Sequence, residues 1–132
     1  MLTWKIGDVT ITRVLETEMP VAYHPKHAFL KEATPEALRG MPWLYPHFVS
    51  EEGHLRLSIH ALVVQAPGMN LVVDTCIGND KPRGLLGGQA LSTAFLESLA
   101  ETGCPRESVD VVVCTHLHVD HVGWNTMLVD GK

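Results

Sequence analysis

The sequence lacks the features that would place it in several broad classes of protein. It has no apolar run long enough to span a membrane, and no run of Lys and Arg that would favour nucleic acid as a partner. Its first residues, 1–8, have neither the basic nor the apolar region of a signal peptide. We therefore expect no membrane partner and no nucleic-acid partner.

Cysteine is scarce and shows no pairing pattern. The chain has three cysteines, Cys76, Cys104 and Cys114, which is an odd number without CxxC spacing. Such cysteines are typical of free thiols in a reducing compartment, so a cytoplasmic location is predicted.

Repeats, linkers and low-complexity segments are also lacking. A chain of 132 residues with a net charge of −5 is long enough for one domain with a real core and short for two. We expect residues 1–132 to form a single domain.

Alternation of apolar and polar residues predicts several strands. Two hairpins are expected, each turning at a glycine, and the second arm of the first hairpin should end within Glu16–Pro20. The expected strands are Trp4–Ile6, Val9–Leu15, Leu55–Ala66 and Met69–Asp74.

Two helices are expected between and after these strands. The shorter begins after the N-cap Thr34 and stops at Gly40. The longer, Leu91–Thr102, has an apolar face and stops at Gly103. With the apolar run Val109–Cys114 as a further, buried strand, this order predicts half of an α/β sandwich.

Four potential metal ligands follow that last strand within six residues. They are His116, His118, Asp120 and His121, in the segment Thr115–Gly123. Imidazole and carboxylate are both zinc ligands, and packing alone does not explain so dense a group. His116 and His118, two residues apart, can project to one side and hold one ion. Asp120 and His121 can reach a second ion close by.

The pattern H-x-H-x-D-H after a strand resembles the signature of the metallo-β-lactamase-fold hydrolases. The resemblance extends to the branch with lactonase-like and organophosphate-hydrolase-like members. It rests on Asp74-Thr75 after the preceding strand, on the run 76–82 and on the run 121–126. The resemblance implies an αββα fold, with a mixed, mostly antiparallel sheet and flanking helices. It also implies two zinc ions in the complete site, although other divalent metals suit the same ligands.

Asp74 has two candidate roles. An aspartate after an apolar strand can accept hydrogen bonds from backbone N–H groups of a turn. It can also orient a metal-bound histidine by accepting its second N–H. The resemblance implies a supporting role and not direct ligation.

The family's remaining ligands have no counterpart here. No histidine follows His121. The remaining residues predict a strand over Thr126–Val129 and a hairpin turn at Asp130-Gly131. We therefore expect the chain to be the N-terminal portion of a longer domain. The loop histidines His24 and His27 are interpreted as solvated rather than as ligands.

The favoured function is metal-dependent hydrolysis of a small-molecule lactone, ester or phosphotriester, with Asp120 as a catalytic residue that orients water or passes a proton. Two alternatives stay open at this point. One is a non-catalytic or weakly metal-binding module, in which an open sheet favours association, including a homo-oligomer. The other is a redox enzyme on the same fold.

Overall fold

The computed structural model describes residues 1–83 and 89–131. The chain divides into two compact units, one made of Met1–Thr17 and Ile59–Lys132 and the other of Glu18–Ser58. The assignment of residues 1–132 to one domain stays a prediction.

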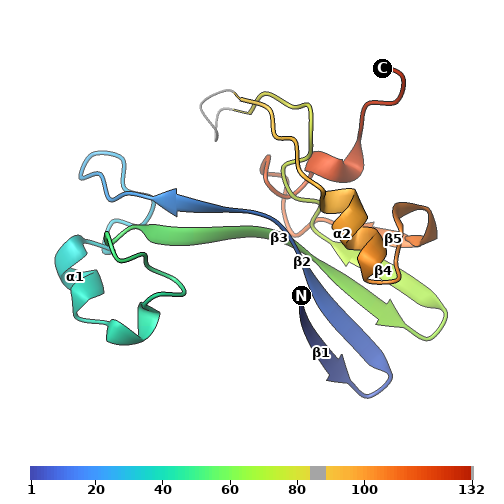
Figure 1. Cartoon of the computed structure of the whole chain (residues 1–132), viewed down its shortest axis with the longest axis horizontal. Helices are drawn as coiled ribbons and strands as arrows, with labels where there is room; N and C mark the ends of the chain where they lie inside the picture. Colours follow the sequence, from blue (N-terminus) through green and yellow to red (C-terminus); the bar gives the residue numbers. More distant parts are fainter. Residues whose placement is uncertain (84–88, 132) are drawn as a thin grey trace. The chain divides into compact units, whose positions relative to one another are not determined.

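The strands form a mixed five-stranded sheet in the order β1-β2-β3-β4-β5 (Figure 1). β1 pairs antiparallel with β2, β3 pairs antiparallel with β4, and β4 pairs parallel with β5. The strands are β1 (Leu2–Ile6), β2 (Val9–Val21), β3 (Leu55–Ala66), β4 (Met69–Val73) and β5 (Val111–Val113). The predicted mixed, mostly antiparallel sheet is confirmed.

Both predicted hairpins are present. Ile6 pairs with Val9 across the first turn, and Ala66 pairs with Met69 across the second. Gly7 and Gly68 have φ values of 59° and 78°, in the left-handed region that glycine enters at little cost.

The prediction that the second strand ends within Glu16–Pro20 was wrong. β2 continues to Val21, and its buried positions Thr12, Val14 and Glu16 keep the two-residue period. Proline lacks only one backbone donor, so Pro20 is tolerated close to the end of the strand.

The unit Glu18–Ser58 contains the predicted short helix. α1 (Pro35–Arg39) is capped by Thr34, whose hydroxyl accepts the backbone N–H of Ala37 at 3.2 Å, and Gly40 follows its last residue. A single 3₁₀ turn, η1 (Pro42–Leu44), comes next.

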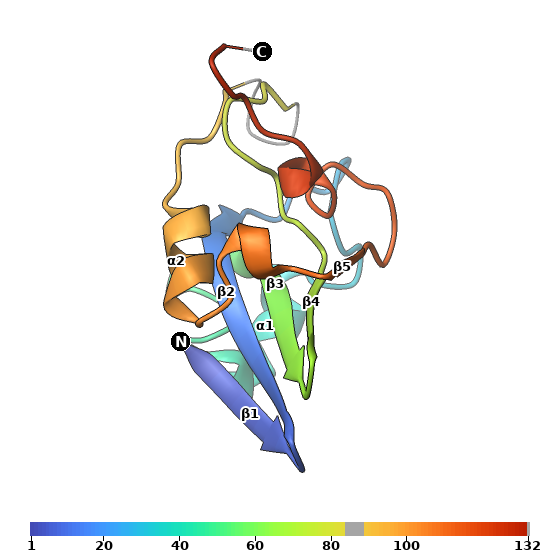
Figure 2. The ribbon, with the colours of Figure 1, turned by 90° about the vertical axis from the view of Figure 1, so that its right-hand side faces the viewer.

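The longer helix, α2 (Phe95–Glu101), starts four residues later than predicted. The side chain of Asn79 accepts the backbone N–H of Thr93 at 2.8 Å, which holds this segment outside the helix. Phe95 and Leu99 are buried, and α2 lies over one face of the sheet (Figure 2). In the described ranges, none of the helices is long and apolar enough to cross a membrane.

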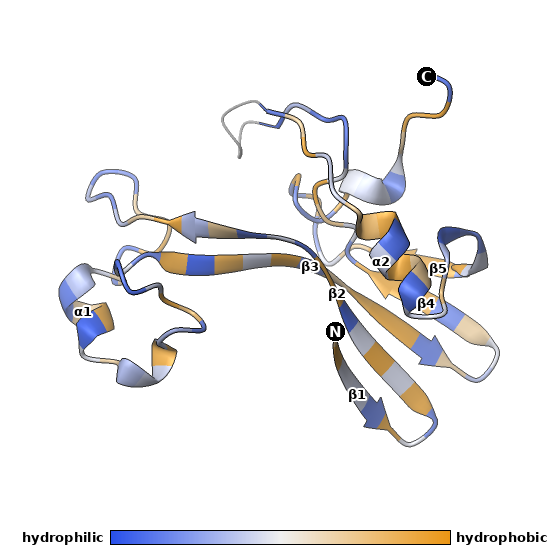
Figure 3. Ribbon diagram, in the orientation of Figure 1, coloured by the Kyte–Doolittle hydropathy of each residue, from blue (hydrophilic) through white to orange (hydrophobic). Residues whose placement is uncertain are grey.

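The strand predicted over Val109–Cys114 is shorter than expected, and its burial was predicted wrongly. β5 covers only Val111–Val113, and these valines are 39%, 47% and 43% exposed. β4 and β5 form an apolar pair (Figure 3). Within the described sheet β5 is the edge strand, so no further strand covers it.

The segment after the metal-ligand motif differs from the prediction as well. The 3₁₀ turns are η3 (Arg106–Ser108) before β5 and η4 (Gly123–Asn125) after the motif. Thr126–Val129 is not a strand, since no backbone segment among the described residues pairs with it. Asp130 and Gly131 do form a turn, with φ values of 51° and 77°.

Candidate metal centre

The ligand motif lies at the carboxyl ends of two neighbouring strands. β5 ends at Val113, and β4 ends just before Asp74. The two strands are parallel, and the backbone N–H of Asp74 donates to the carbonyl of Val113 at 2.8 Å. The motif loop and Asp74 therefore meet at one edge of the sheet, as expected for a functional loop of an α/β protein.

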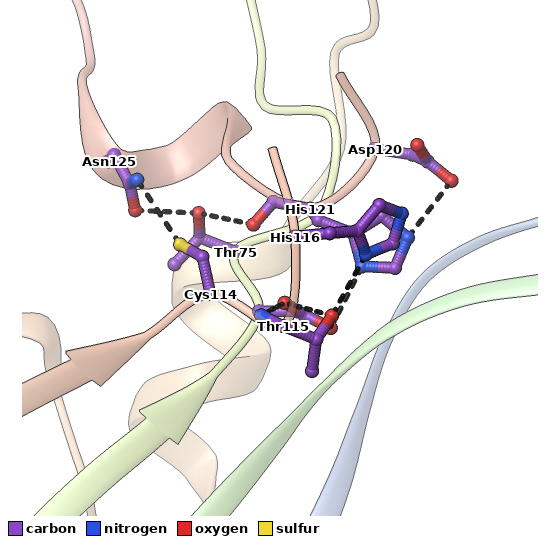
Figure 4. A network of polar contacts seen from close by, with 8 residues as sticks. Thr75, Cys114, Thr115, His116, Asp120, His121 and Asn125 are labelled. Atoms are coloured by element: carbon purple, nitrogen blue, oxygen red, sulfur yellow. Dashed lines mark hydrogen bonds and ion pairs between the residues drawn. The ribbon is translucent and has the colours of Figure 1, made fainter. Parts of the chain in front are cut away.

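The fold brings the three histidines of the motif together. The ring centroid of His116 lies 4.7 Å from that of His118 and 3.9 Å from that of His121. The rings of His116 and His121 lie side by side, with Asp120 next to them (Figure 4). Three imidazoles this close give a concentrated set of nitrogen donors for a metal.

Asp120 and His121 have the separation of two ligands on one ion. Oδ2 of Asp120 lies 3.4 Å from Nε2 of His121. Two donors on a tetrahedral zinc, at bond lengths of about 2.0–2.2 Å, stand about 3.3–3.6 Å apart. This donor pair therefore fits a zinc ion.

Asp74 fixes the orientation of His121. Its Oδ2 lies 2.8 Å from Nδ1 of His121, which leaves Nε2 free to face Asp120. Asp74 also accepts the backbone N–H of Thr115 at 2.8 Å. Asp74 is thus the partner of a motif histidine, as one of its two predicted roles requires, while the backbone N–H that it accepts comes from Thr115, 41 positions away, and not from its own turn.

The same contacts keep the carboxylate of Asp74 ionised. Burial opposes ionisation, but the hydrogen bonds from the Thr115 backbone, His121 and the Thr115 hydroxyl outweigh it and lower the pKa of Asp74. An ionised acceptor favours the tautomer of His121 that carries its proton on Nδ1.

Cys76 lies close to the motif but does not suit a metal. Its side chain is fully buried, and burial raises the pKa of the thiol. The nearby carboxylates of Glu16, Asp74 and Asp120 raise this pKa further. Cysteines buried in this way are inert, so the more exposed oxygen and nitrogen donors of the motif are the better candidates.

Backbone hydrogen bonds tie the loop after β4 to the end of the motif. The N–H of Thr75 donates to the carbonyl of His121 at 2.9 Å, and the N–H of Trp124 donates to that of Thr75 at 2.8 Å. The N–H of Gly123 donates to the carbonyl of Cys76 at 2.7 Å. These three bonds set the position of His121 relative to Asp74.

Gly123 makes this close approach possible. A Cβ atom at this position would lie 1.9 Å from the carbonyl carbon and oxygen of Ile77. Any side chain here would separate the two backbone segments.

Pairs of donor side chains have the separation that a metal requires, but they do not form a complete coordination shell. Among the described residues, no group of three or more His, Cys, Asp and Glu side chains has the arrangement of a preformed metal site. His24 and His27 stack on each other, with ring centroids 5.2 Å apart, in the exposed part of the other unit. The candidate site therefore consists of the motif residues and Asp74, and the role of the motif residues as ligands stays a prediction.

Sequence reasoning missed two polar residues that support the motif. The hydroxyl of Thr115 lies 2.8 Å from Oδ2 of Asp74, and the hydroxyl of Thr75 lies 2.8 Å from Oδ1 of Asn125. Each partner is at least 41 positions away along the chain. A local spacing pattern carries no signal for such contacts.

Among the solved structures with a similar fold are several hydrolases. One is a probable metal-dependent hydrolase from Staphylococcus aureus, with 24% identity over 91% of this chain and 42% of that chain, at a TM-score of 0.64. Another is the hydrolase AbOPH of the beta lactamase superfamily, with 23% identity over 91% of this chain and 37% of that chain, at a TM-score of 0.60.

A third similar structure is AidC, a dizinc quorum-quenching lactonase in complex with a product. It shares 16% identity over 98% of this chain and 42% of that chain, at a TM-score of 0.68. This chain thus spans roughly two fifths of the length of these structures. No curated protein is significantly similar to it in sequence.

The family model of the metallo-beta-lactamase superfamily matches residues 54–131. The match includes the second hairpin, α2, β5 and all four motif ligands. This chain belongs to the metallo-beta-lactamase superfamily.

Proposed function

We propose that this chain carries the first ligand motif of a metal-dependent hydrolase. The observation that carries the proposal is the arrangement around His121, whose Nδ1 is held by Asp74 and whose Nε2 faces Asp120 at ligand separation. This is the pattern of an imidazole prepared to bind a metal through Nε2.

The motif residues divide between two ions in this proposal. His116 and His118 hold the first ion, and Asp120 and His121 hold the second. Zinc is the proposed metal, although other divalent ions suit the same donors. When bound, such ions act as Lewis acids and lower the pKa of water to about 7.

Asp120 is the proposed catalytic residue. Its carboxylate lies on the motif loop beside the rings of His121 and His116 (Figure 4). There it can accept a proton from an attacking water and deliver it to the leaving group, which is general acid–base catalysis by one carboxyl group.

The proposed substrates are small molecules with a lactone, ester or phosphotriester group. The lactonase among the similar structures supports the lactone, and the esters and phosphotriesters come from the resemblance of the motif. We also propose that residues 1–132 are part of a larger hydrolase domain, because four donors do not fill two four-coordinate ions. A cytoplasmic location is part of the same proposal and rests on the three free cysteines.

A second candidate is a metal-binding module without turnover. The observation that favours it is that no complete cage of three or more ligands is formed by the described residues. Both candidate functions include metal binding, and only the first includes hydrolysis of a substrate.

Metal content and hydrolysis, measured on the same sample, test the proposal. The purified chain is equilibrated with zinc, freed of excess metal, and analysed for zinc and for cleavage of a lactone and a phosphotriester. We expect at least about one zinc per chain, because two nitrogen donors and a carboxylate–imidazole pair are available.

The matched control is the double variant His118→Ala/His121→Ala, which removes a ligand from each proposed ion. Equal zinc content in the variant and the natural chain would refute the metal site. Turnover by the natural chain would exclude the binding module, while zinc without turnover is expected of a chain that carries only part of the ligand set.

A further inference from the structure

Glu16 is a buried carboxylate that the proposed chemistry does not use. It lies on β2 within the unit that carries the motif and is only 9% exposed. Among the described residues, three N–H groups from elsewhere in the chain donate to it, and all three are uncharged. A buried carboxylate is costly unless such donors compensate for the lost water, so the arrangement calls for an explanation.

The first two donors belong to the loop that follows β4. The backbone N–H of Ile77 donates to Oε2 of Glu16 at 2.7 Å, and that of Gly78 donates to Oε1 at 3.0 Å. Gly78 has a φ of 80° and passes close to the backbone of Gly123. Glu16 therefore fixes the loop at the point where it meets the end of the motif.

The third donor lies directly after the motif. The indole N–H of Trp124 donates to Oε1 of Glu16 at 2.7 Å. The ring of Trp124 also stacks on Phe95 of α2, with centroids 5.6 Å apart. One carboxylate thus connects β2, the loop after β4 and the segment that ends the motif.

We propose that Glu16 is a positioning residue for the metal loop. By holding residues 77–78 and Trp124 in one place, it maintains the backbone bonds that set His121 against Asp74. It acts through the backbone and touches none of the motif ligands. The inference rests on the proposed function for its link to metal binding.

The substitution Glu16→Gln separates hydrogen bonding from packing. Glutamine has nearly the same shape, but its amide NH₂ replaces one acceptor oxygen. In one orientation the NH₂ opposes the N–H of Ile77, and in the other it opposes those of Gly78 and Trp124. Either orientation breaks the three-donor arrangement without creating a cavity.

The matched control is Glu18→Gln, on the same strand. Glu18 is 39% exposed at its side chain and pairs with Arg56 at 2.8 Å, which is a surface ion pair. An exposed pair of this kind contributes little to stability. The control makes the same chemical change away from the motif.

Two measurements are made on the natural chain and on both variants. The first is amide hydrogen exchange of Thr75, Gly123 and Trp124 in the metal-free protein, which reports the three backbone bonds. We expect about tenfold faster exchange in Glu16→Gln and no change in Glu18→Gln. The second is titration with zinc alone, in which we expect about tenfold weaker binding by Glu16→Gln.

Unchanged exchange in Glu16→Gln would overturn the inference, and so would faster exchange with unaltered zinc affinity. Absence of zinc binding by the natural chain would refute the proposed function, while the exchange comparison still decides whether Glu16 orders the loop. If Glu16→Gln does not fold, Trp124→Phe keeps the stacking on Phe95 and removes one donor. It should give a smaller change in the same direction, about threefold in exchange, and no change there would also overturn the inference.

Discussion

At the scale of single residues, the site is organised by carboxylates that receive N–H donors. Asp74 holds His121 and the backbone of Thr115, while Glu16 holds the loop and Trp124. A hydrogen bond to an ionised group is stronger than one between neutral groups. Single substitutions at these positions should therefore have effects larger than those at exposed polar residues.

His118→Ala should reduce metal binding without unfolding the chain. His118 is exposed and its ring contacts that of His116, so truncation removes a donor and little packing. Removal of a hydrogen-bond partner of a ligand weakens metal binding by about 10–100-fold, and removal of the ligand His118 itself should weaken zinc binding by more than that. Zinc content by elemental analysis is the measurement, with His24→Ala as the control because His24 lies in the exposed loop of the other unit. Equal losses in both variants would contradict the assignment.

Asp74→Asn should weaken zinc binding by about 10–100-fold, since the amide keeps one acceptor oxygen where the carboxylate has one for His121 and one for the backbone of Thr115. The amide keeps the size of the side chain, so global stability should change less than metal affinity. Zinc titration and the ring nitrogen NMR signals of His121 are the measurements. Asp110→Asn is the matched control, because Asp110 accepts the backbone N–H of Asn70, at 2.8 Å, just before β5 begins, whereas the motif follows the end of β5. An unaltered His121 tautomer in Asp74→Asn would argue against the role of Asp74.

At the scale of elements, the end of the motif is held against the loop after β4 by close backbone contact. Two glycines, Gly78 and Gly123, face each other there, and neither leaves room for a Cβ atom. The short distance between these two backbone segments therefore depends on the absence of a side chain in both of them.

Gly123→Ala should destabilise the protein by about 3 kcal/mol, at the upper end of the cost of overpacking a tight site. The added methyl group would meet the carbonyl group of Ile77 at 1.9 Å, and backbone atoms do not move aside as a flexible side chain does. The free energy of unfolding in urea is the measurement. Gly40→Ala is the control, since Gly40 has a φ of −71° and its nearest neighbour would be the carbonyl oxygen of Ala37 at 3.3 Å. A cost below about 1 kcal/mol for Gly123→Ala would contradict this close packing.

At the scale of the whole molecule, β5 is an apolar edge. Val111 and Val113 point to one face of this three-residue strand, and Val112 points to the other. All three are partly exposed, and an open apolar edge strand is a surface for pairing with another chain. The homo-oligomer expected from the sequence stays a prediction, and this edge is the surface at which it can be tested.

Val111→Lys/Val113→Lys should weaken self-association. Two charges on one face of β5 oppose burial of this edge. The loss of even one buried valine side chain corresponds to an increase of about tenfold in the dissociation constant. Sedimentation equilibrium over a range of concentrations is the measurement. Val129→Lys, at an exposed valine outside the sheet, is the control. A monomeric natural chain, or equal effects of both changes, would exclude pairing through β5.

The sequence by itself determined the features that depend on neighbouring residues. Two-residue alternation and glycine turns predicted both hairpins, the cap at Thr34 predicted α1, and the dense spacing of the motif predicted that its histidines lie together. The family match to residues 54–131 agrees with the resemblance of that motif. Periods, caps and spacings are local, so they can be read without knowing what packs against them.

Only the tertiary structure decided the features that depend on distant partners. The contact of Glu16 with Trp124 joins residues 108 positions apart, and that of Asp74 with His121 joins residues 47 apart. The late start of α2 depends on Asn79, and the exposure of β5 depends on its place at the edge of the sheet. Such contacts form because folding brings separate segments together, and burial then makes their hydrogen bonds obligatory.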